Sequence, residues 1–281
     1  MQSDSPRSIA RALDLTGKVA LITGGGGLLG PRHGEAIAEM GGIAVLGDVD
    51  LRRAQQAAED IAKVYGVKTG AVRLDVTDQQ GLVGVVDAVE QEYGAIDILI
   101  NNAANDPKVG ATAGQEFSRV ENFSLKAWEN DIAVGLTGAF ICCQVIGSRM
   151  AARNRGVILN ISSDLGIVAP DQRLYAKVGL PLDQQPVKPV TYSVVKHGII
   201  GLTKYLATYW ANQSVRVNAL APGGVMAAQS KEFLDRVNSR IPLGRLARPD
   251  EYKAAVAFLC SDASSYVTGA VLVADGGRTV W

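Results

Sequence analysis

The chain has 281 residues, a length that fits one large α/β domain or two small domains. Its composition, 47% hydrophobic and 20% charged, is that of a globular protein and excludes disordered and coiled-coil classes. Lys and Arg together number 28, as do Asp and Glu, and this balance argues against a nucleic-acid-binding protein and a polybasic membrane anchor.

Residues 1–16 are polar, carry Arg7 and Arg11, and lack the apolar core of a signal peptide. We therefore expect an N-terminal arm followed by a single domain over residues 17–281. The three cysteines and two histidines form neither a CxxC pair nor a metal-ligand pattern, so the sequence predicts a reducing, cytoplasmic location and no metal site. The longest uncharged stretch, 132–148, contains three glycines and predicts a buried helix rather than a membrane span.

From residue 18 onward, short runs rich in Val, Ile and Leu alternate with longer segments of helical periodicity. Such continuous apolar runs are typical of strands buried on both faces, as in a parallel sheet. The predicted strands are 18–23, 43–46, 71–74, 96–100, 157–161, 215–220 and 271–273. The predicted helices are at about 33–40, 51–65, 79–93, 125–153, 192–211 and 249–260. This alternation predicts an α/β fold: a Rossmann-like, doubly wound parallel sheet of seven strands with helices on both faces.

Three connections, 103–123, 163–190 and 221–248, are too long for tight turns. Each follows the carboxyl end of a predicted strand, where ligands bind in open α/β sheets, so we expect them to form the walls of a substrate pocket. The second connection offers polar groups that would suit a sugar derivative or a hydroxy acid: Asp171, Gln172, Arg173, Tyr175 and Lys177. A solvated loop or a subunit contact is the alternative for this segment.

The first predicted strand runs into a glycine-rich turn, TGGGGLLGPRHG, at residues 23–34. Glycines let the backbone approach a pyrophosphate, which then meets the positive end of the following helix; a tight turn without a ligand is the alternative. Asp48 follows the second strand, 18 residues beyond Gly30. A carboxylate there accepts hydrogen bonds from the adenosine ribose and repels a 2′-phosphate, whereas the alternative is a helix cap. Because no basic residue stands beside Asp48 or within residues 24–30, the sequence predicts NAD rather than NADP.

Tyr192 and Lys196, in YSVVK, lie one helical turn apart and therefore share a helix face. A tyrosine with a pKa near ~10 is a poor acid–base catalyst at neutral pH, but a nearby ammonium favours the phenolate. Ser163 ends the fifth predicted strand, where its hydroxyl would reach a reacting oxygen. The alternatives are a strand-end cap for Ser163 and an interfacial position for Tyr192.

Together these residues resemble the short-chain dehydrogenase/reductase family, and the resemblance covers nearly the whole chain. The family's motifs appear in order: TGGGGLLG at 23–30, DVTD at 75–78, NNAA at 101–104, NISS at 160–163, YSVVK at 192–196, PGGV at 222–225 and DGG at 275–277. The resemblance implies that the catalytic residues are Ser163, Tyr192 and Lys196. It implies a cofactor site formed by Gly24, Gly27, Leu28, Leu29, Gly30, Asp48, Asp75, Val76, Asn102, Ala103, Tyr192, Lys196, Pro222, Gly223 and Val225.

The resemblance also assigns roles within that site. It implies that Asp75 and Val76 flank the adenine, that Val225 meets the carboxamide through its backbone, and that Lys196 holds the nicotinamide ribose. It implies an assembly as well: a homodimer through the two long helices, or a homotetramer completed by the C-terminal strand.

Two departures from the family pattern bear on activity. Leu28 replaces the middle glycine of the first motif, and Gly135 replaces an asparagine that in the family helps to hold a water between the lysine and bulk solvent. We expect an NAD-dependent oxidoreductase that interconverts a secondary alcohol and a carbonyl of a small polar substrate. The alternative is a catalytically weak nucleotide-binding homologue that acts as a sensor or assembly partner, and a sugar-nucleotide epimerase or dehydratase is disfavoured. We expect packing or surface roles for His33, Cys142 and Cys143.

Overall fold

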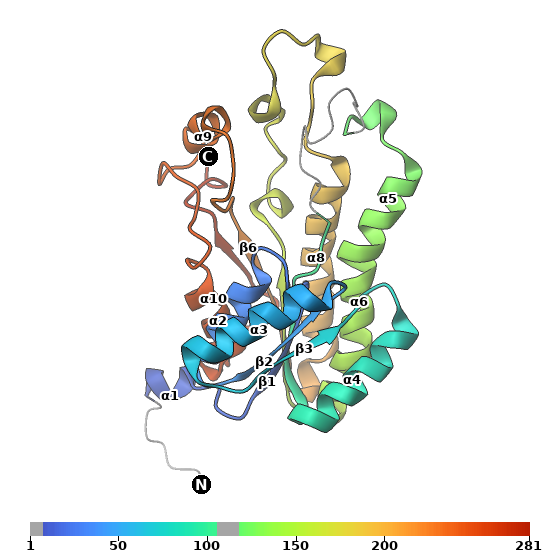
Figure 1. The fold of residues 1–281 in the computed structure, drawn as a ribbon, viewed down its shortest axis with the longest axis vertical. Coiled ribbons are helices and arrows are strands. Elements are labelled where there is room, and N and C mark those ends of the chain that lie inside the picture. Colours follow the sequence, from blue (N-terminus) through green and yellow to red (C-terminus); the bar gives the residue numbers. More distant parts are fainter. Residues whose placement is uncertain (1–7, 106–117) are drawn as a thin grey trace.

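The structure, a computed structural model, describes residues 8–105 and 118–281. Within these residues seven strands form one parallel sheet in the order β3-β2-β1-β4-β5-β6-β7, with helices on both faces (Figure 1). The predicted doubly wound, Rossmann-like fold is therefore confirmed. The strands are β1 (Val19–Thr23), β2 (Ile43–Asp48), β3 (Thr69–Arg73), β4 (Ile96–Asn101), β5 (Gly156–Ile161), β6 (Val215–Pro222) and β7 (Val271–Ala274).

Each of the six predicted helices has a counterpart among the described residues, the one at 125–153 in three pieces, and two further helices lie at residues 9–13 and 231–238. In chain order the helices are α1 (Ile9–Leu13), α2 (Gly30–Glu39), α3 (Leu51–Tyr65), α4 (Gln79–Tyr93), α5 (Leu125–Ile132), α6 (Gly138–Cys142), α7 (Ser148–Ala152), α8 (Val190–Tyr209), α9 (Lys231–Asn238) and α10 (Lys253–Cys260). The helix α9 falls inside a segment that the sequence analysis assigned to a loop. Ser230 caps it, because its side chain accepts a hydrogen bond from the amide of Phe233.

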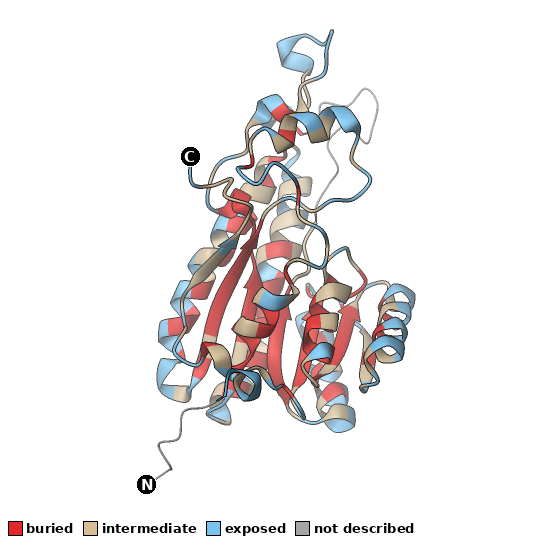
Figure 2. Ribbon diagram, turned by 90° about the vertical axis from the view of Figure 1, so that its left-hand side faces the viewer, coloured by how far each residue is buried: buried red, intermediate tan, exposed pale blue. Residues whose placement is uncertain are grey.

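Alternate residues of each strand enter different hydrophobic cores. On β1, Val19 and Leu21 belong to the core that α4, the α6–α7 region and α8 complete. Ala20 and Ile22 belong to the core on the other face, which α2, α3 and α10 complete. Figure 2 shows the result, a sheet whose central strands are buried between two helical layers, whereas the edge strands β3 and β7 are only partly buried. A strand buried on both faces is apolar at every position, which explains why the strands read as continuous hydrophobic runs.

Helices α5, α6 and α7 form one long rod, joined by π-helical turns at Ala133–Thr137 and Cys143–Gly147. The rod, Leu125–Ala152, is long and apolar enough by length and composition to cross a membrane. Packing accounts for much of this apolar character, because Cys142, Cys143 and Met150 lie in the core against the sheet. Burial raises the pKa of the Cys143 thiol to about 12, so this cysteine has a packing role, as expected.

The carboxyl ends of the strands all meet at one edge of the sheet, and the connections after β5 and β6 gather above it (Figure 1). There Leu174 from the first connection packs with Val237, Ile241 and Leu246 from the second in a small separate core. An ion pair between Asp171 and Arg240 adds a second link between the two connections. The long connections therefore form a structured cap over the edge at which ligands bind in this architecture.

Candidate active site

A cleft of about 1320 Å³ lies under this cap. Its walls come from the glycine-rich turn after β1, the ends of β2 to β6, the start of α8 and both capping connections. Pockets for drug-sized ligands usually measure ~300–1,000 Å³, so this cleft has room for a dinucleotide and a second small molecule together. Of the residues predicted for the cofactor and catalytic sites, all except Gly30 line this cleft.

Gly30 has a packing role that explains its absence from the lining. A Cβ at this position would lie 2.3 Å from the carbonyl oxygen of Gly24, so only glycine lets the turn close tightly against the start of α2. Gly24 itself has a φ of +63°, and a Cβ there would lie 2.9 Å from the Cα of Ala103. The turn therefore places Leu29, the residue before α2, in the wall of the cleft, and the start of a helix at this place fits a pyrophosphate.

The carboxylate of Asp48 is hydrogen-bonded to the backbone of the glycine turn. It accepts hydrogen bonds from the amides of Gly26 and Asp50, both at 2.9 Å. The cap of α3 is Asp50, whose side chain accepts from the amide of Arg53, so the capping alternative for Asp48 is wrong. The sequence analysis missed Arg53, whose Cβ would lie 2.8 Å from a Cβ at Gly26. The end of the cleft at the glycine turn thus has an acidic group in its wall and a basic residue next to the turn.

Two further predicted residues hold the ends of β1 and β4 together. The amides of Asn102 and Ala103 both donate to the hydroxyl of Thr23 at 3.0 Å. The side-chain amide of Asn102 donates to the carbonyls of Thr23 and Gly24, each at 3.0 Å. These bonds join the glycine turn to the end of β4, so this part of the cleft is fixed before any ligand enters.

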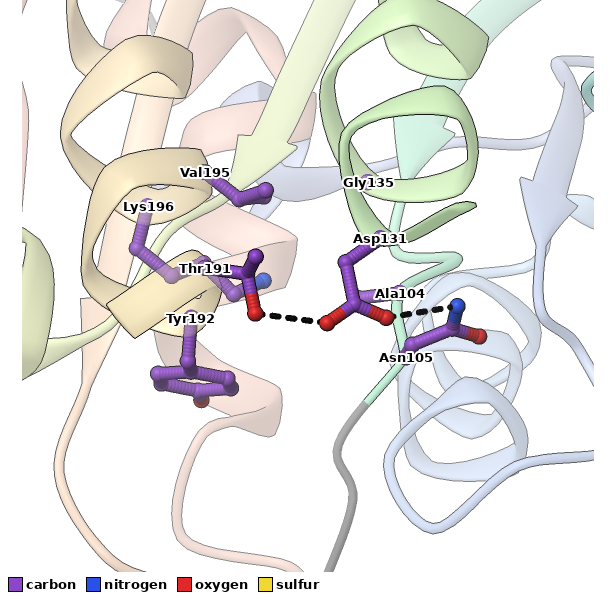
Figure 3. A pocket seen from close by; sticks show the side chains of 8 residues that line it. All are labelled: Ala104, Asn105, Asp131, Gly135, Thr191, Tyr192, Val195 and Lys196. Carbon is purple, nitrogen blue, oxygen red and sulfur yellow. Dashed lines mark hydrogen bonds between the residues drawn. The ribbon is translucent and has the colours of Figure 1, made fainter. Parts of the chain in front are cut away.

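The three predicted catalytic residues come together at the other end of the cleft. Ser163 follows β5 and is buried, and its hydroxyl donates to the Asp164 carboxylate at 2.7 Å. Lys196, on the inner face of α8, donates from Nζ to the carbonyl of Ile161 at 2.8 Å. The same Nζ lies 5.8 Å from the centroid of the Tyr192 ring, one turn earlier on α8 (Figure 3). A hydroxyl, a phenol and an ammonium thus line the same cleft.

Asp164 also pairs with Arg278, which the sequence analysis did not single out. The carboxylate and the guanidinium are 4% and 13% exposed, and both residues line the cleft. This ion pair joins the C-terminal segment to the residue after Ser163. Its only sequence signal was the position of Arg278 directly after the DGG motif, because the two partners are 114 residues apart.

The structure gives a steric reason for Gly135. A Cβ at this position would lie 2.6 Å from Cγ1 of Val195, which occupies the space beside the long rod (Figure 3). An asparagine side chain therefore does not fit at this position while Val195 is present. The glycine at position 135, where the family has an asparagine, is therefore matched to Val195, a residue of the YSVVK motif.

Asp131, which the sequence analysis also did not single out, lies one helical turn before Gly135. Asp131 on α5 accepts hydrogen bonds from the Thr191 hydroxyl at 2.5 Å and from the Asn105 amide at 3.0 Å (Figure 3). Thr191 directly precedes Tyr192, so this network fixes the first turn of α8 against the rod and the end of β4. The predicted loop 103–123 lies largely outside the described residues, but Ala104 and Asn105 line the cleft.

The polar residues predicted near the substrate divide into two groups. Tyr175 and Lys177 line the cleft. Asp171 does not, because it forms ion pairs with Arg173 and Arg240. The expectation that Asp171, Gln172 and Arg173 face the substrate side is therefore corrected: Asp171 and Arg173 form an ion pair in the cap, and Gln172 accepts a hydrogen bond from the amide of Lys188.

Known proteins resemble this chain over nearly its whole length. A family model described as short chain dehydrogenase matches residues 18–176, and one described as Enoyl-(Acyl carrier protein) reductase matches residues 184–279. The chain is 35% identical to D-threitol dehydrogenase of Mycolicibacterium smegmatis, over 95% of this chain and 94% of that protein. It is 29% identical to NAD-dependent glycerol dehydrogenase of Listeria innocua, over 95% of this chain and 96% of that protein.

A solved structure is similar over the full length. It is a gluconate 5-dehydrogenase from Burkholderia cenocepacia in complex with NADP and tartrate, with a TM-score of 0.84 and 28% identity. The match covers 98% of this chain and 100% of that one. Full-length likeness in sequence and fold, with the Ser163, Tyr192 and Lys196 set on the wall of the cleft, leads to one conclusion. The chain belongs to the short-chain dehydrogenase/reductase family, whose members are oxidoreductases that use NAD or NADP on alcohol and carbonyl substrates.

Proposed function

We propose that the protein is an NAD(H)-dependent oxidoreductase that interconverts a secondary alcohol and a carbonyl of a small polar substrate. The observation that carries this proposal is the position of Ser163, Tyr192 and Lys196 in the lining of a cleft that continues to the glycine turn. The tight Gly24–Gly30 contact and the N-terminus of α2 fit a dinucleotide at the other end.

The chain's own residues have separate tasks in the proposed reaction. When bound, the nicotinamide supplies hydride chemistry, and the protein supplies orientation and electrostatics. The phenol oxygen of Tyr192 takes the proton of the substrate hydroxyl during oxidation and returns it during reduction. The Ser163 hydroxyl orients the reacting oxygen. The ammonium of Lys196, close to the Tyr192 ring and buried, favours the phenolate form.

Asp48 supports the choice of NAD. Its carboxylate lines the adenosine end of the cleft and would repel a 2′-phosphate. Arg53 beside Gly26 is the feature that favours NADP instead, and the named relatives include both an NAD-dependent enzyme and an NADP complex. We give Asp48 more weight because it lines the cleft.

The polar lining supports a polyhydroxy or hydroxy-acid substrate. Tyr175, Lys177 and Arg236 come from the cap and face the same cleft as Ser163. Among the relatives, one is named for the polyol D-threitol and another for gluconate, with tartrate bound. We propose a substrate of this chemical kind.

We also propose a cytoplasmic homo-oligomer, a dimer or tetramer. Large apolar side chains on the outer faces of the rod and of α8 support it: Phe140, Tyr205 and Tyr209 are 46%, 63% and 62% exposed.

The test is a screen of turnover with NAD and with NADP against polyols, sugar acids and their carbonyl forms, followed by absorbance of the reduced cofactor. Reduction of NAD by at least one secondary alcohol supports the proposal. If NAD binds and no substrate turns over, the alternative of a catalytically weak nucleotide-binding homologue is favoured. The steric fit of Gly135 against Val195 weakens that alternative, because this position is a repacked contact rather than a missing one.

A further inference from the structure

A second lysine contacts the proposed acid–base group. Lys188 lies two residues before α8 begins, and its Nζ is 3.9 Å from the centroid of the Tyr192 ring. The corresponding distance for Lys196 is 5.8 Å. Both lysines and the tyrosine line the cleft. The Tyr192 ring therefore has two ammonium groups near it, one from the segment before α8 and one from α8 itself.

The backbone around Lys188 is held in place. Its amide donates to the side-chain oxygen of Gln172 at 2.8 Å, and Pro189, with φ of −54°, follows it directly before α8. Thr191, bonded to Asp131, fixes the first turn of the helix on the other side of Pro189. The start of the lysine side chain is therefore set by two elements that do not depend on a ligand.

A cation over an aromatic face is attracted by the π electrons of the ring. When the phenol loses its proton, the negative charge spreads from the oxygen into the ring, so the same cation binds the phenolate more strongly than the phenol. An opposite charge at this range favours the ionised form. The contact therefore acts on the protonation state of Tyr192 as well as on its position.

We propose that Lys188 is a positioning residue that stabilises the phenolate form of Tyr192 together with Lys196. The inference rests on the proposed acid–base role of Tyr192. In the oxidation direction, the substrate O–H bond breaks and its proton passes to the Tyr192 oxygen; a bound nicotinamide would supply the hydride acceptor for the carbon that carries this oxygen. Lys188 takes no part in the proton transfer, and its effect is to lower the free energy of the phenolate that accepts the proton.

The other charged groups around Tyr192 have partners of their own. Asp131 on α5 is held by Thr191 and Asn105. Asp164 after β5 is paired with Arg278. From α9, Glu232 and Arg236 form a pair at 3.5 Å, and Lys177 adds a further positive charge to the cap side of the cleft. The Lys188 ammonium lies closer to the ring centroid than the Lys196 ammonium does, and its removal is expected to shift the equilibrium between phenol and phenolate more than removal of a distant charge.

The test is a direct titration of Tyr192 in the intact enzyme, by NMR of tyrosines labelled with carbon-13 at Cζ. Tyr192→Phe assigns the signal. We expect Lys188→Met to raise the pKa of Tyr192 by about one unit and Lys188→Arg to keep it near the wild-type value. Lys63→Met, an exposed lysine on α3, is the matched control and is expected to leave the titration unchanged. This measurement needs no substrate, so its outcome is independent of whether the proposed reaction is correct.

Kinetics supply the second readout once a substrate is known. The acid limb of the kcat/KM profile for oxidation should move to higher pH in Lys188→Met by the same amount as the titration. A titration in Lys188→Met within about 0.3 unit of wild type would overturn the proposal. A second result would also overturn it: Lys188→Met raises KM for acidic substrates while the titration of Tyr192 is unchanged. Lys188 would then bind the substrate instead of acting on Tyr192.

Discussion

Asp48 is the residue on which the cofactor preference depends. We predict that NAD binds at least ten times more tightly than NADP, which corresponds to ~1.4 kcal/mol. Asp48→Asn should narrow this gap, because it removes the charge that repels a 2′-phosphate and keeps an oxygen for the Gly26 amide. Titration of both nucleotides into both proteins measures it. Asp50→Asn, which changes the neighbouring carboxylate that caps α3, should keep the wild-type preference. Equal affinities in the wild type would refute this assignment.

His33 makes the stability of the fold depend on pH. It is buried on α2 and 1% exposed, and burial lowers its pKa from the ordinary value of 6.5 to about 4. In the unfolded chain the imidazole gains a proton as pH falls through 6.5, but in the folded protein it stays neutral until about 4. The contribution of His33 to the free energy of unfolding is therefore fully present above pH 6.5 and is lost as the pH falls from 6.5 to about 4.

For a fully buried group with this shift, linkage predicts a loss of about 2 kcal/mol between pH 7.5 and pH 5. Urea unfolding of wild type and of His33→Leu at both pH values measures it. The variant, which has no group to titrate at this position, should show a smaller decrease. If the two proteins lose the same free energy over this range, His33 is not the cause.

At the scale of elements, the strands and the first four predicted helices follow from periodicity because each buries its apolar residues in the main cores. The strand β3 shows the limit: its burial pattern is mixed, and it starts at Thr69 because pairing with β2 extends the ladder beyond the apolar run. The helix α9 was missed because its buried face is short and packs against the other capping connection. The hydrophobic pattern of the α9 residues alone does not predict this contact.

The site divides in the same way. Ser163, Tyr192 and Lys196 were predictable because each belongs to a motif with a fixed place on a strand end or a helix face. The roles of Asp131 and Arg278 were not predictable, because their partners are distant in sequence. The role of Lys188 was not predictable either, because it depends on the position of its side chain over the Tyr192 ring. The spacing of residues along the chain predicts which of them lie on the same helix or strand. It does not predict which helices and strands come together around the cleft.

The rod and α8 are matched at Gly135 and Val195, and this gives a prediction at the element scale. Gly135→Asn should destabilise the protein by about 1–3 kcal/mol, because the new side chain overpacks against Val195. The double variant Gly135→Asn/Val195→Ala should recover part of this loss, since it removes the methyl groups in conflict. Denaturant unfolding of the four proteins of this cycle measures the coupling. Additive losses would show that the two positions do not share one space.

For the whole molecule, the exposed apolar side chains of α6 and α8 predict an interface. Tyr205 and Tyr209 stack with ring centroids 5.8 Å apart and project from the same face of α8. Tyr205→Glu/Tyr209→Glu should shift the mass measured by light scattering from an oligomer towards the monomer, because charges would enter an apolar contact. Val64→Glu, at a 72% exposed position on α3, should not. A monomeric wild type would contradict this assembly.

The central claim is that this cleft performs hydride transfer with Tyr192 as the acid–base group. The most direct measurement is turnover of wild type and Tyr192→Phe with NAD and the substrate found in the screen, beside the affinity of both proteins for NAD. The variant keeps the ring and loses only the hydroxyl, so NAD should still bind, while turnover should fall by the ~10²–10⁴ typical of a lost general acid–base group. A variant that binds NAD and retains more than about a tenth of the wild-type rate would contradict the account.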